Sequence, residues 1–230
     1  MSLPPLIWDT FQTLHAAPQT MDELWAEGWR HFGAEFFRYS VSPQADGWQT
    51  IVPLRLHLAE LTLTKSQRRV LRKNEDVELR TVPATLSEEA KAMFLRHKAR
   101  FTENIPEALT TFLSTEPNVV PCRCMEFQAW VAGELAAISY LDLGEKSVSS
   151  VYGMFEPAHA KRSLGIYTLL QEMLWAQAQG FALYYPGYAT HGSSAYDYKK
   201  QLHGLEGYCW REHRWMPRED IVAETWVVGS

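Results

Sequence analysis

The residues that could do chemistry gather around one predicted helix, over residues 162–179. Glu172 follows Gly165 by seven residues, about two helical turns, so both lie on one face. A carboxylate there can act as a base or bind a cation; the alternatives are a surface acid or a buried acid paired with a tyrosine. Ser150 and Tyr152 stand two apart on a predicted strand and share a face. Their hydroxyls could donate to a carbonyl oxygen, and the alternative for Tyr152 is core packing.

The elements that must position these residues follow a clear order in the second half of the chain. Alternating patterns and tight turns predict three antiparallel strands over 122–131, 134–143 and 147–155. The helix follows, and then a strand over 181–185 that ends at Pro186 and Gly187. This is the core order of the GNAT acyltransferase fold, so we expect an α+β, GNAT-like fold. Tyr188 would lie where the strands of such a fold splay apart to admit substrate.

The first half predicts a similar mixture of elements. Helices are expected over 6–16, 20–32, 65–74, 87–103 and 106–114, and strands over 35–41, 48–58 and 77–82. This order could be a degenerate copy of the second half. We therefore expect duplicated GNAT-like halves, a first domain over 1–115 and a second over 116–230. A further strand-like piece covers 208–211, within an otherwise irregular tail.

Composition limits the class of protein. The chain has 230 residues, of which 46% are hydrophobic and 21% charged, so we expect a globular protein with a sizeable core. No apolar run approaches the ~18 residues that would span a membrane, and the start of the chain does not resemble a secretory signal. The net charge of −5 argues against a general nucleic-acid binder. Residues 61–100, however, hold ten Lys or Arg against five acids.

Three cysteines cannot form a disulfide framework, which favours a cytoplasmic location. Cys122 and Cys124 share a strand face, and their spacing favours packing over a metal clasp, because no second ligand pair is visible. The eight histidines are scattered and form no catalytic or metal motif. We therefore predict no metal and no cofactor.

The start of the long helix argues against acetyl-CoA. In GNAT acetyltransferases this junction carries an arginine and two small residues, and its backbone N–H groups hold the pyrophosphate. Arg162 and Gly165 match that pattern, but Tyr167 stands where the last small residue is needed. Its ring would occupy the place of the phosphate. The alternative for Gly165 is close helix packing.

Several segments resemble one family, the arginyl-tRNA–protein transferases with their bacterial relatives, the aspartate/glutamate leucyltransferases. The segments are Ser-Ser-Val-Tyr at 149–152, Ser-Leu-Gly-Ile-Tyr at 163–167 with Glu172 further on, Tyr-Tyr-Pro-Gly-Tyr at 184–188, Pro-Leu-Arg at 53–55 and Ser-Gln-Arg-Arg at 66–69. The resemblance spans roughly residues 22–217. The chain departs from the family pattern in having no cysteine before Cys122 and in the segment 192–199.

The resemblance implies an enzyme that moves an aminoacyl group, Arg or Leu, from charged tRNA to a protein N-terminal amine. That is the chemistry of protein arginylation and the N-end rule, and it uses no acetyl-CoA. Charged tRNA and protein N-termini would be the partners, with no membrane involved. The basic helix would face the tRNA backbone through Lys65, Arg68, Arg69, Arg72 and Lys73; the alternative is a solvated face.

The resemblance divides the candidate residues into two groups. Glu172, Tyr152 and Ser150 are the catalytic candidates. Substrate would be bound by Tyr188, Gly187, Asp197, Lys199, Tyr167 and Arg162. Two other functions stay open: an N-acetyltransferase that uses acetyl-CoA, and a non-catalytic module that binds peptide or tRNA.

Overall fold

The computed structural model describes residues 5–44, 47–102, 105–190, 197–217 and 220. Its central element is a nine-stranded sheet with the order β12-β11-β5-β10-β9-β8-β7-β6, in which β4 also pairs with β5. The bounds of the sheet's strands are β4 Val41–Gln44, β5 Gly47–His57, β6 Glu78–Pro83, β7 Arg123–Val131, β8 Glu134–Leu143, β9 Ser147–Phe155, β10 Leu183–Thr190, β11 Leu205–Cys209 and β12 Arg214–Pro217. Within this sheet β10 runs parallel to β9, whereas the other pairs are antiparallel.

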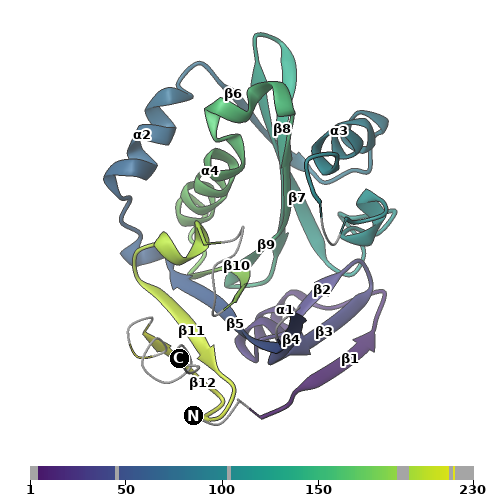
Figure 1. Ribbon diagram of the computed structural model, residues 1–230, viewed down its shortest axis with the longest axis vertical. Coiled ribbons are helices and arrows are strands. Elements are labelled where there is room, and N and C mark those ends of the chain that lie inside the picture. Colours follow the sequence, from purple (N-terminus) through teal and green to yellow (C-terminus); the bar gives the residue numbers. More distant parts are fainter. Residues whose placement is uncertain (1–4, 45–46, 103–104, 191–196, 218–219, 221–230) are drawn as a thin grey trace.

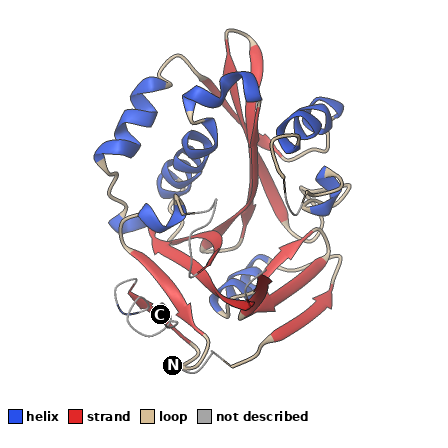
Figure 2. Cartoon of the chain, viewed as in Figure 1, coloured by secondary structure: helices blue, strands red, loops and turns tan. Residues whose placement is uncertain are grey.

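Helices cover both faces of the sheet (Figure 1). α4 (Leu164–Ala178) and α2 (Lys65–Lys73) pack together on one face, and α3 (Glu88–Lys98) packs against β9 from the other. Within the described residues, short 3₁₀ turns join the elements: η1 Leu58–Glu60, η2 Leu109–Thr111, η3 Pro157–Arg162 and η4 Lys199–Gln201. The mixture of layers in Figure 2 is that of an α+β fold. The order β7-β8-β9-α4-β10 is the GNAT-like order that the sequence predicted. Within the described ranges, each helix is too short or too polar to cross a membrane.

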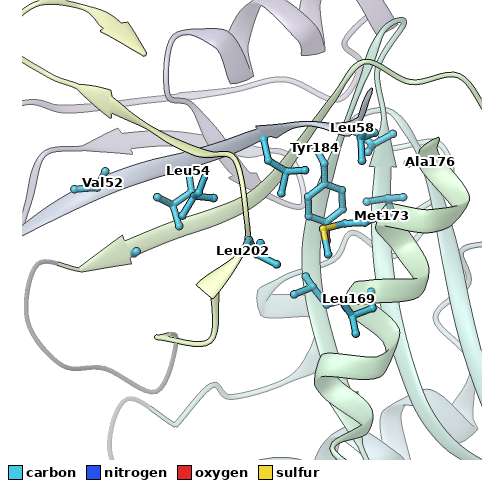
Figure 3. Packing of buried hydrophobic residues seen from close by; sticks show 14 of the residues in the cluster. Val52, Leu54, Leu58, Leu169, Met173, Ala176, Tyr184 and Leu202 are labelled. Atoms are coloured by element: carbon cyan, nitrogen blue, oxygen red, sulfur yellow. The ribbon is translucent and has the colours of Figure 1, made fainter. Parts of the chain in front are cut away.

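The main core lies between α4 and the sheet. Leu169 and Met173 of α4 pack against Leu54 and Leu58 and against Tyr184 of β10 (Figure 3). A fully buried leucine side chain contributes about 1.5–3 kcal/mol through the hydrophobic effect, so this layer holds α4 firmly on the sheet. The helix that carries Glu172 is therefore a rigid support.

The N-terminal region adds a three-stranded sheet with the order β1-β3-β2, from β1 (Trp8–Gln12), β2 (Arg30–Phe32) and β3 (Glu35–Tyr39). α1 (Pro18–Ala26) connects β1 to β2. The carboxylate of Asp22 in α1 accepts a hydrogen bond from Lys146 N at 2.8 Å, at the turn between β8 and β9. A side chain at Gly144 would collide with that carboxylate, which explains the glycine. The small sheet is thus attached to the main one close to β9.

The helix predicted over 6–16 was wrong, because this segment contains strand β1 (Trp8–Gln12). The helix predicted over 20–32 is present as α1 but ends at Ala26, before strand β2. Cross-strand aromatic contacts favour the strand, because Phe11 stacks on Phe36 at 4.8 Å between ring centroids. Residues 109–111 form only a 3₁₀ turn within the helix expected over 106–114.

The strand expected to end at Pro186 runs on to Thr190. A register shift between Tyr184 and Gly187 lets the strand pass the proline, which has no N–H to donate to a ladder. Strands β5 and β6, from residues 1–115, lie in the same sheet as the strands of 116–230. The duplication of two halves stays a prediction.

Candidate active site

The candidate site lies where β9 and β10 separate. The two strands pair in parallel only over three residues, of which the last pair is Tyr185 with Ser149. Beyond that point β10 pairs with β5 only, starting from Gly187 with Leu54, while β9 continues beside β8. Pro186 cannot donate to β9, and this removes the next hydrogen bond of the ladder. The sheet therefore opens at Ser150, as splayed strands of a GNAT-like fold do.

Glu172 of α4 lies at this opening. Its side chain is fully buried, and its Oε2 accepts a hydrogen bond of 2.5 Å from the Tyr184 hydroxyl. The side chains of Ser139 and Ser150 lie beside the same carboxyl group. Its other oxygen, Oε1, makes no hydrogen bond of normal geometry within the part of the chain that the structure describes. One oxygen is thus fixed by a tyrosine, and the other is a buried acceptor without a hydrogen bond among the described residues.

Burial raises the pKa of Glu172 to about 7, because a charged carboxylate loses its water in this position. The hydroxyl groups of Tyr184, Ser139 and Ser150 and the nearby charge of Lys199 act in the opposite direction. A carboxyl with a pKa near 7 can both accept and release a proton at neutral pH. These are the properties of a general base.

Two cationic side chains complete the cluster. A Cβ atom at Gly187, which has a φ of +101°, would lie 3.1 Å from Lys199 Nζ and 3.6 Å from Arg30 Nη2. The buried guanidinium of Arg30 donates to Ser149 Oγ and to the backbone oxygen of Ser150. Arg30 thus satisfies a carbonyl at the place where the ladder ends. Glycine at 187 lets both cations approach the backbone closely.

Arg30 and Glu172 have opposite effects on the pKa of Lys199. Burial and the charge of Arg30 lower the pKa of Lys199 to about 7, and the carboxylate of Glu172 acts against this shift. Like charges oppose each other, so a third, negative group placed near Arg30 and Lys199 would relieve their repulsion. The arrangement favours an anionic ligand beside a proton-accepting carboxylate.

The structure brings together only some of the predicted catalytic residues. Ser150 lies beside Glu172, whereas Tyr152 does not. Leu141 of β8 pairs with Ser150, but its neighbour Tyr140 pairs with Tyr152. The residue of β9 between Ser150 and Tyr152 therefore has no partner in β8. This bulge breaks the expected two-residue alternation. The Tyr152 ring stacks on Phe112 at 4.1 Å, in the cluster on the α3 side of the sheet, which is the core packing that the sequence left open.

Only some of the predicted substrate-binding residues lie at the opening between β9 and β10. Gly187 and Lys199 line the opening. Tyr188 donates to the backbone oxygen of Gly28 at 2.7 Å and contacts the ring of Tyr39, so it joins β10 to the N-terminal region. Asp197 forms an ion pair with Lys200 at 2.6 Å.

Arg162 and Tyr167 lie at the other end of α4. Arg162 Nη1 pairs with Asp76 Oδ1 at 2.8 Å, and Tyr167 packs in an apolar cluster with Leu71 of α2 and Leu164. The structure therefore does not bring them to Glu172. Tyr167 is buried in contacts between helices and sheet, so its ring fills the position beside the start of α4.

The basic helix is α2. Thr64 and Gln67 form a capping box at its start. Five basic side chains of α2 are exposed: Lys65, Arg68, Arg69, Arg72 and Lys73. In the described ranges, none of them forms an ion pair. Because α2 packs against α4, the basic face belongs to the same layer as Glu172.

Sequence reasoning missed Arg30, Tyr184 and Ser139 as members of the cluster. Arg30 fell within a predicted helix, and its partner Ser149 is 119 residues away in the chain. No local pattern indicates such a pairing. Tyr184 had one signal, since a buried Glu172 paired with a tyrosine was among the alternatives. The structure confirms that pairing.

Comparisons with known proteins agree on one family. A family model described as arginine-tRNA-protein transferase, C terminus, matches residues 89–209. An aspartate/glutamate leucyltransferase from Stenotrophomonas maltophilia (strain K279a) is 30% identical over 198 residues, which cover 82% of this chain and 76% of the relative. A protein of the same name from Chromohalobacter salexigens is 29% identical, with coverage of 83% and 78%.

One solved structure gives a weaker match. It is the C-terminal domain of a putative lysylphosphatidylglycerol synthetase from Agrobacterium fabrum. The alignment covers 60% of this chain and 46% of that chain, with 16% identity and a TM-score of 0.47.

Proposed function

Because the chain belongs to the arginine-tRNA–protein transferase family, we propose that it joins leucine from charged tRNA to the N-terminal amine of proteins that begin with Asp or Glu. The chain is an aminoacyltransferase of the aminoacyl-tRNA–protein class. The choice of leucine and of acidic acceptors follows the names of the relatives. The observation that supports the proposal best is the buried carboxyl of Glu172 near Lys199, which approaches Arg30 across Gly187 at the splayed strands.

The acceptor is matched by charge. Lys199 and Arg30 approach each other across Gly187, and a carboxylate of an N-terminal Asp or Glu would neutralise that pair. Arg30 is already oriented by Ser149 and by the backbone of Ser150, so its guanidinium is preorganised. An acceptor that begins with Lys or Arg would instead add a third positive charge.

Glu172 would then act on the acceptor amine. Its Oε1 takes a proton from the N-terminal ammonium, which leaves a nucleophilic amine. The amine attacks the ester carbonyl of the aminoacyl-tRNA, an amide bond forms and the ester C–O bond breaks. The proton passes from Glu172 to the departing ribose oxygen, so the carboxylate is restored. The attacking nitrogen carries a positive charge after the attack, and its excess proton passes to that carboxylate and then to solvent. Tyr184 holds Oε2 and orients the carboxyl, and Ser150 is the nearby hydroxyl for the developing negative charge.

The exposed face of α2 is proposed to bind the tRNA backbone. Lysine and arginine side chains on one helix face can neutralise successive phosphates, and this attraction is independent of sequence. The three cysteines of the described ranges are free, and charged tRNA is the donor; both fit a cytoplasmic enzyme.

Arginine is the second candidate for the donor. Glu172 is a buried carboxylate, and a guanidinium brought to its Oε1 would form a charge-assisted hydrogen bond. In that case Glu172 binds the donor side chain and does not act as the base.

A transfer assay tests the proposal. The purified protein is mixed with tRNA charged with labelled leucine or, separately, labelled arginine, and with peptides that begin with Asp, Glu, Lys or Arg. Label from leucine on the Asp and Glu peptides is expected, and the same peptides with acetylated N-termini should remain unlabelled. Label from arginine alone would assign the second candidate. No label from either donor, with the protein folded, would contradict both.

A further inference from the structure

A second buried polar cluster lies outside the proposed active site. It consists of His31 of β2, Asp142 of β8 and Cys122, immediately before β7. The potential ligand atoms of these three residues all lie within 4.8 Å of one another. All three residues are buried: the exposed fraction is 5% for His31, 3% for Asp142 and 4% for Cys122. Three different donor types from three parts of the chain thus meet in one enclosed place.

The hydrogen bonds of His31 define the state of its ring. Nδ1 lies 2.9 Å from the carbonyl oxygen of Gly33, which can only accept, so Nδ1 carries a hydrogen. Nε2 lies 2.7 Å from Oδ2 of Asp142. A neutral imidazole protonated at Nδ1 would point a lone pair at a carboxylate oxygen. The pairing therefore needs a positive charge between the two atoms, either a proton or a metal ion.

Other features of the cluster favour the metal ion. Histidines that bind metals usually donate their second ring N–H to a backbone carbonyl, as His31 does to Gly33. The Cys122 thiol hydrogen-bonds to Asp142, and a second thiol, that of Cys124, lies beside the same carboxylate. Nitrogen, oxygen and sulfur donors together are the set that zinc prefers. The sequence showed no histidine or carboxylate beside Cys122, and the fold supplies both through His31 and Asp142.

We propose that His31, Asp142 and Cys122 bind one zinc ion. Zinc bonds to nitrogen and oxygen of about 2.0 Å require tetrahedral ligand atoms roughly 3.2 Å apart, so Nε2 and Oδ2 would separate by about half an ångström. On binding, the thiol of Cys122 and the His31 ring each release a proton. The three ligands would tie β2 of the small sheet to β8 and to the residue before β7 of the main sheet, and a water molecule would complete the tetrahedron.

The ion would also steady the active site. His31 follows Arg30 on β2, so a bond from His31 to a metal would hold the strand that delivers the Arg30 guanidinium to Ser149 and Ser150. Arg30 is a member of the proposed acceptor site, whereas His31 points to Asp142. The zinc is therefore expected to act through the position of Arg30.

Metal content tests the proposal directly. The full chain is incubated with zinc, freed of excess by gel filtration and analysed by mass spectrometry of the metal. About one zinc per chain is expected for the wild type and for Cys209→Ser, which changes a buried thiol on another strand. Removing a residue that only supports a ligand lowers metal affinity by roughly 10-fold to 100-fold. Cys122→Ser removes a ligand, so the loss of zinc affinity should be larger than that. A wild type without zinc, or a Cys122→Ser chain with unchanged affinity, would overturn the proposal.

Two spectra of the wild type keep the proposal testable if a variant fails to fold. Cobalt in place of zinc should give the intense visible bands of a tetrahedral site and a thiolate-to-cobalt charge-transfer band. Nitrogen NMR of the His31 ring with zinc present should show Nε2 bound to metal and Nδ1 bound to hydrogen. A ring with hydrogens on both nitrogens after zinc is added would assign the pairing to an imidazolium and a carboxylate, and the proposal would fail.

Discussion

Glu172 and Asp142 are buried acids on opposite faces of the same sheet, and their surroundings differ. Glu172 lies on the α4 face, where one oxygen binds Tyr184 and the other makes no hydrogen bond of normal geometry among the described residues. Asp142 alternates with Leu141 and so faces the α3 side, where His31 and two thiols surround it. The first acid can exchange a proton, whereas the second is suited to hold its neighbours or an ion in place. The two acids therefore differ in the hydrogen bonding of their oxygens and not in their burial.

The largest difference between the two acids should appear in the rate of transfer. Glu172→Gln keeps the shape of the side chain but removes the base, so kcat should fall by about 100-fold or more. Single-turnover transfer of labelled leucine at saturating charged tRNA measures this. Glu89→Gln, at an exposed position of α3, is the matched control and should keep the wild-type rate. Equal rates for both variants would show that Glu172 does not act as the base.

Asp142→Asn should act on stability instead. Removing one partner of the buried pair between Asp142 and His31 leaves the other unsatisfied, and the free energy of unfolding should fall by about 3 kcal/mol. Urea unfolding of wild type and variant gives the difference. The mutation Glu206→Gln breaks the partly exposed pair with Arg55 and should cost less, about 1 kcal/mol. A smaller decrease for Asp142→Asn than for Glu206→Gln would contradict the structural role.

The α2 surface should control affinity without changing the chemistry. Replacing Arg68, Arg69 and Arg72 by alanine should weaken the binding of charged tRNA and reduce its salt slope by about one for each phosphate that is no longer neutralised. The single-turnover rate at saturating tRNA should stay the same. Lys91→Ala, on the opposite side of the sheet, is the control. Binding with an unchanged salt slope would place the tRNA elsewhere.

Tyr184→Phe should give the smallest effect, a shift in the pH profile. Burial raises the pKa of Glu172, and the Tyr184 hydrogen bond is among the interactions that oppose this rise. Without the hydroxyl, the pKa of Glu172 should rise further, so the ascending limb of kcat against pH moves to higher pH. Tyr185→Phe, whose ring packs near Trp25, should leave the limb in place. If the ascending limb of Tyr184→Phe stays at the wild-type pH, Tyr184 does not influence the pKa of Glu172.

Local patterns predicted the main sheet well. The bounds of β8 and β9 agree with the expected strands, because alternation and tight turns are encoded within each segment. The N-terminal 32 residues were harder, since the aromatic side chains of β1 meet their neighbours only in the folded sheet. Pairing with β3 overrides their local helical pattern.

The candidate site was predicted in part. Glu172 was found through family motifs and helix geometry, and Gly187 and Lys199 through their position after the strand. Tyr152 was misplaced because one extra residue in β9 reverses the faces, and a bulge leaves no reliable trace in a single sequence. Arg30 reaches the site only through hydrogen bonds with a strand 119 residues later. Such long-range pairings depend on the folded chain.

The pH dependence of a single turnover tests the central claim, that Glu172 accepts the proton of the acceptor amine. Transfer of labelled leucine to an Asp-initiated peptide is followed across roughly two pH units centred near neutrality, in wild type and in Glu172→Gln. We predict that the wild-type rate rises as the pH passes about 7, where the carboxyl loses its proton. The variant should be slow, and its rate should rise only where the acceptor amine itself loses its proton, at about pH 8. A variant with the same limb and the same rate as the wild type would contradict the account.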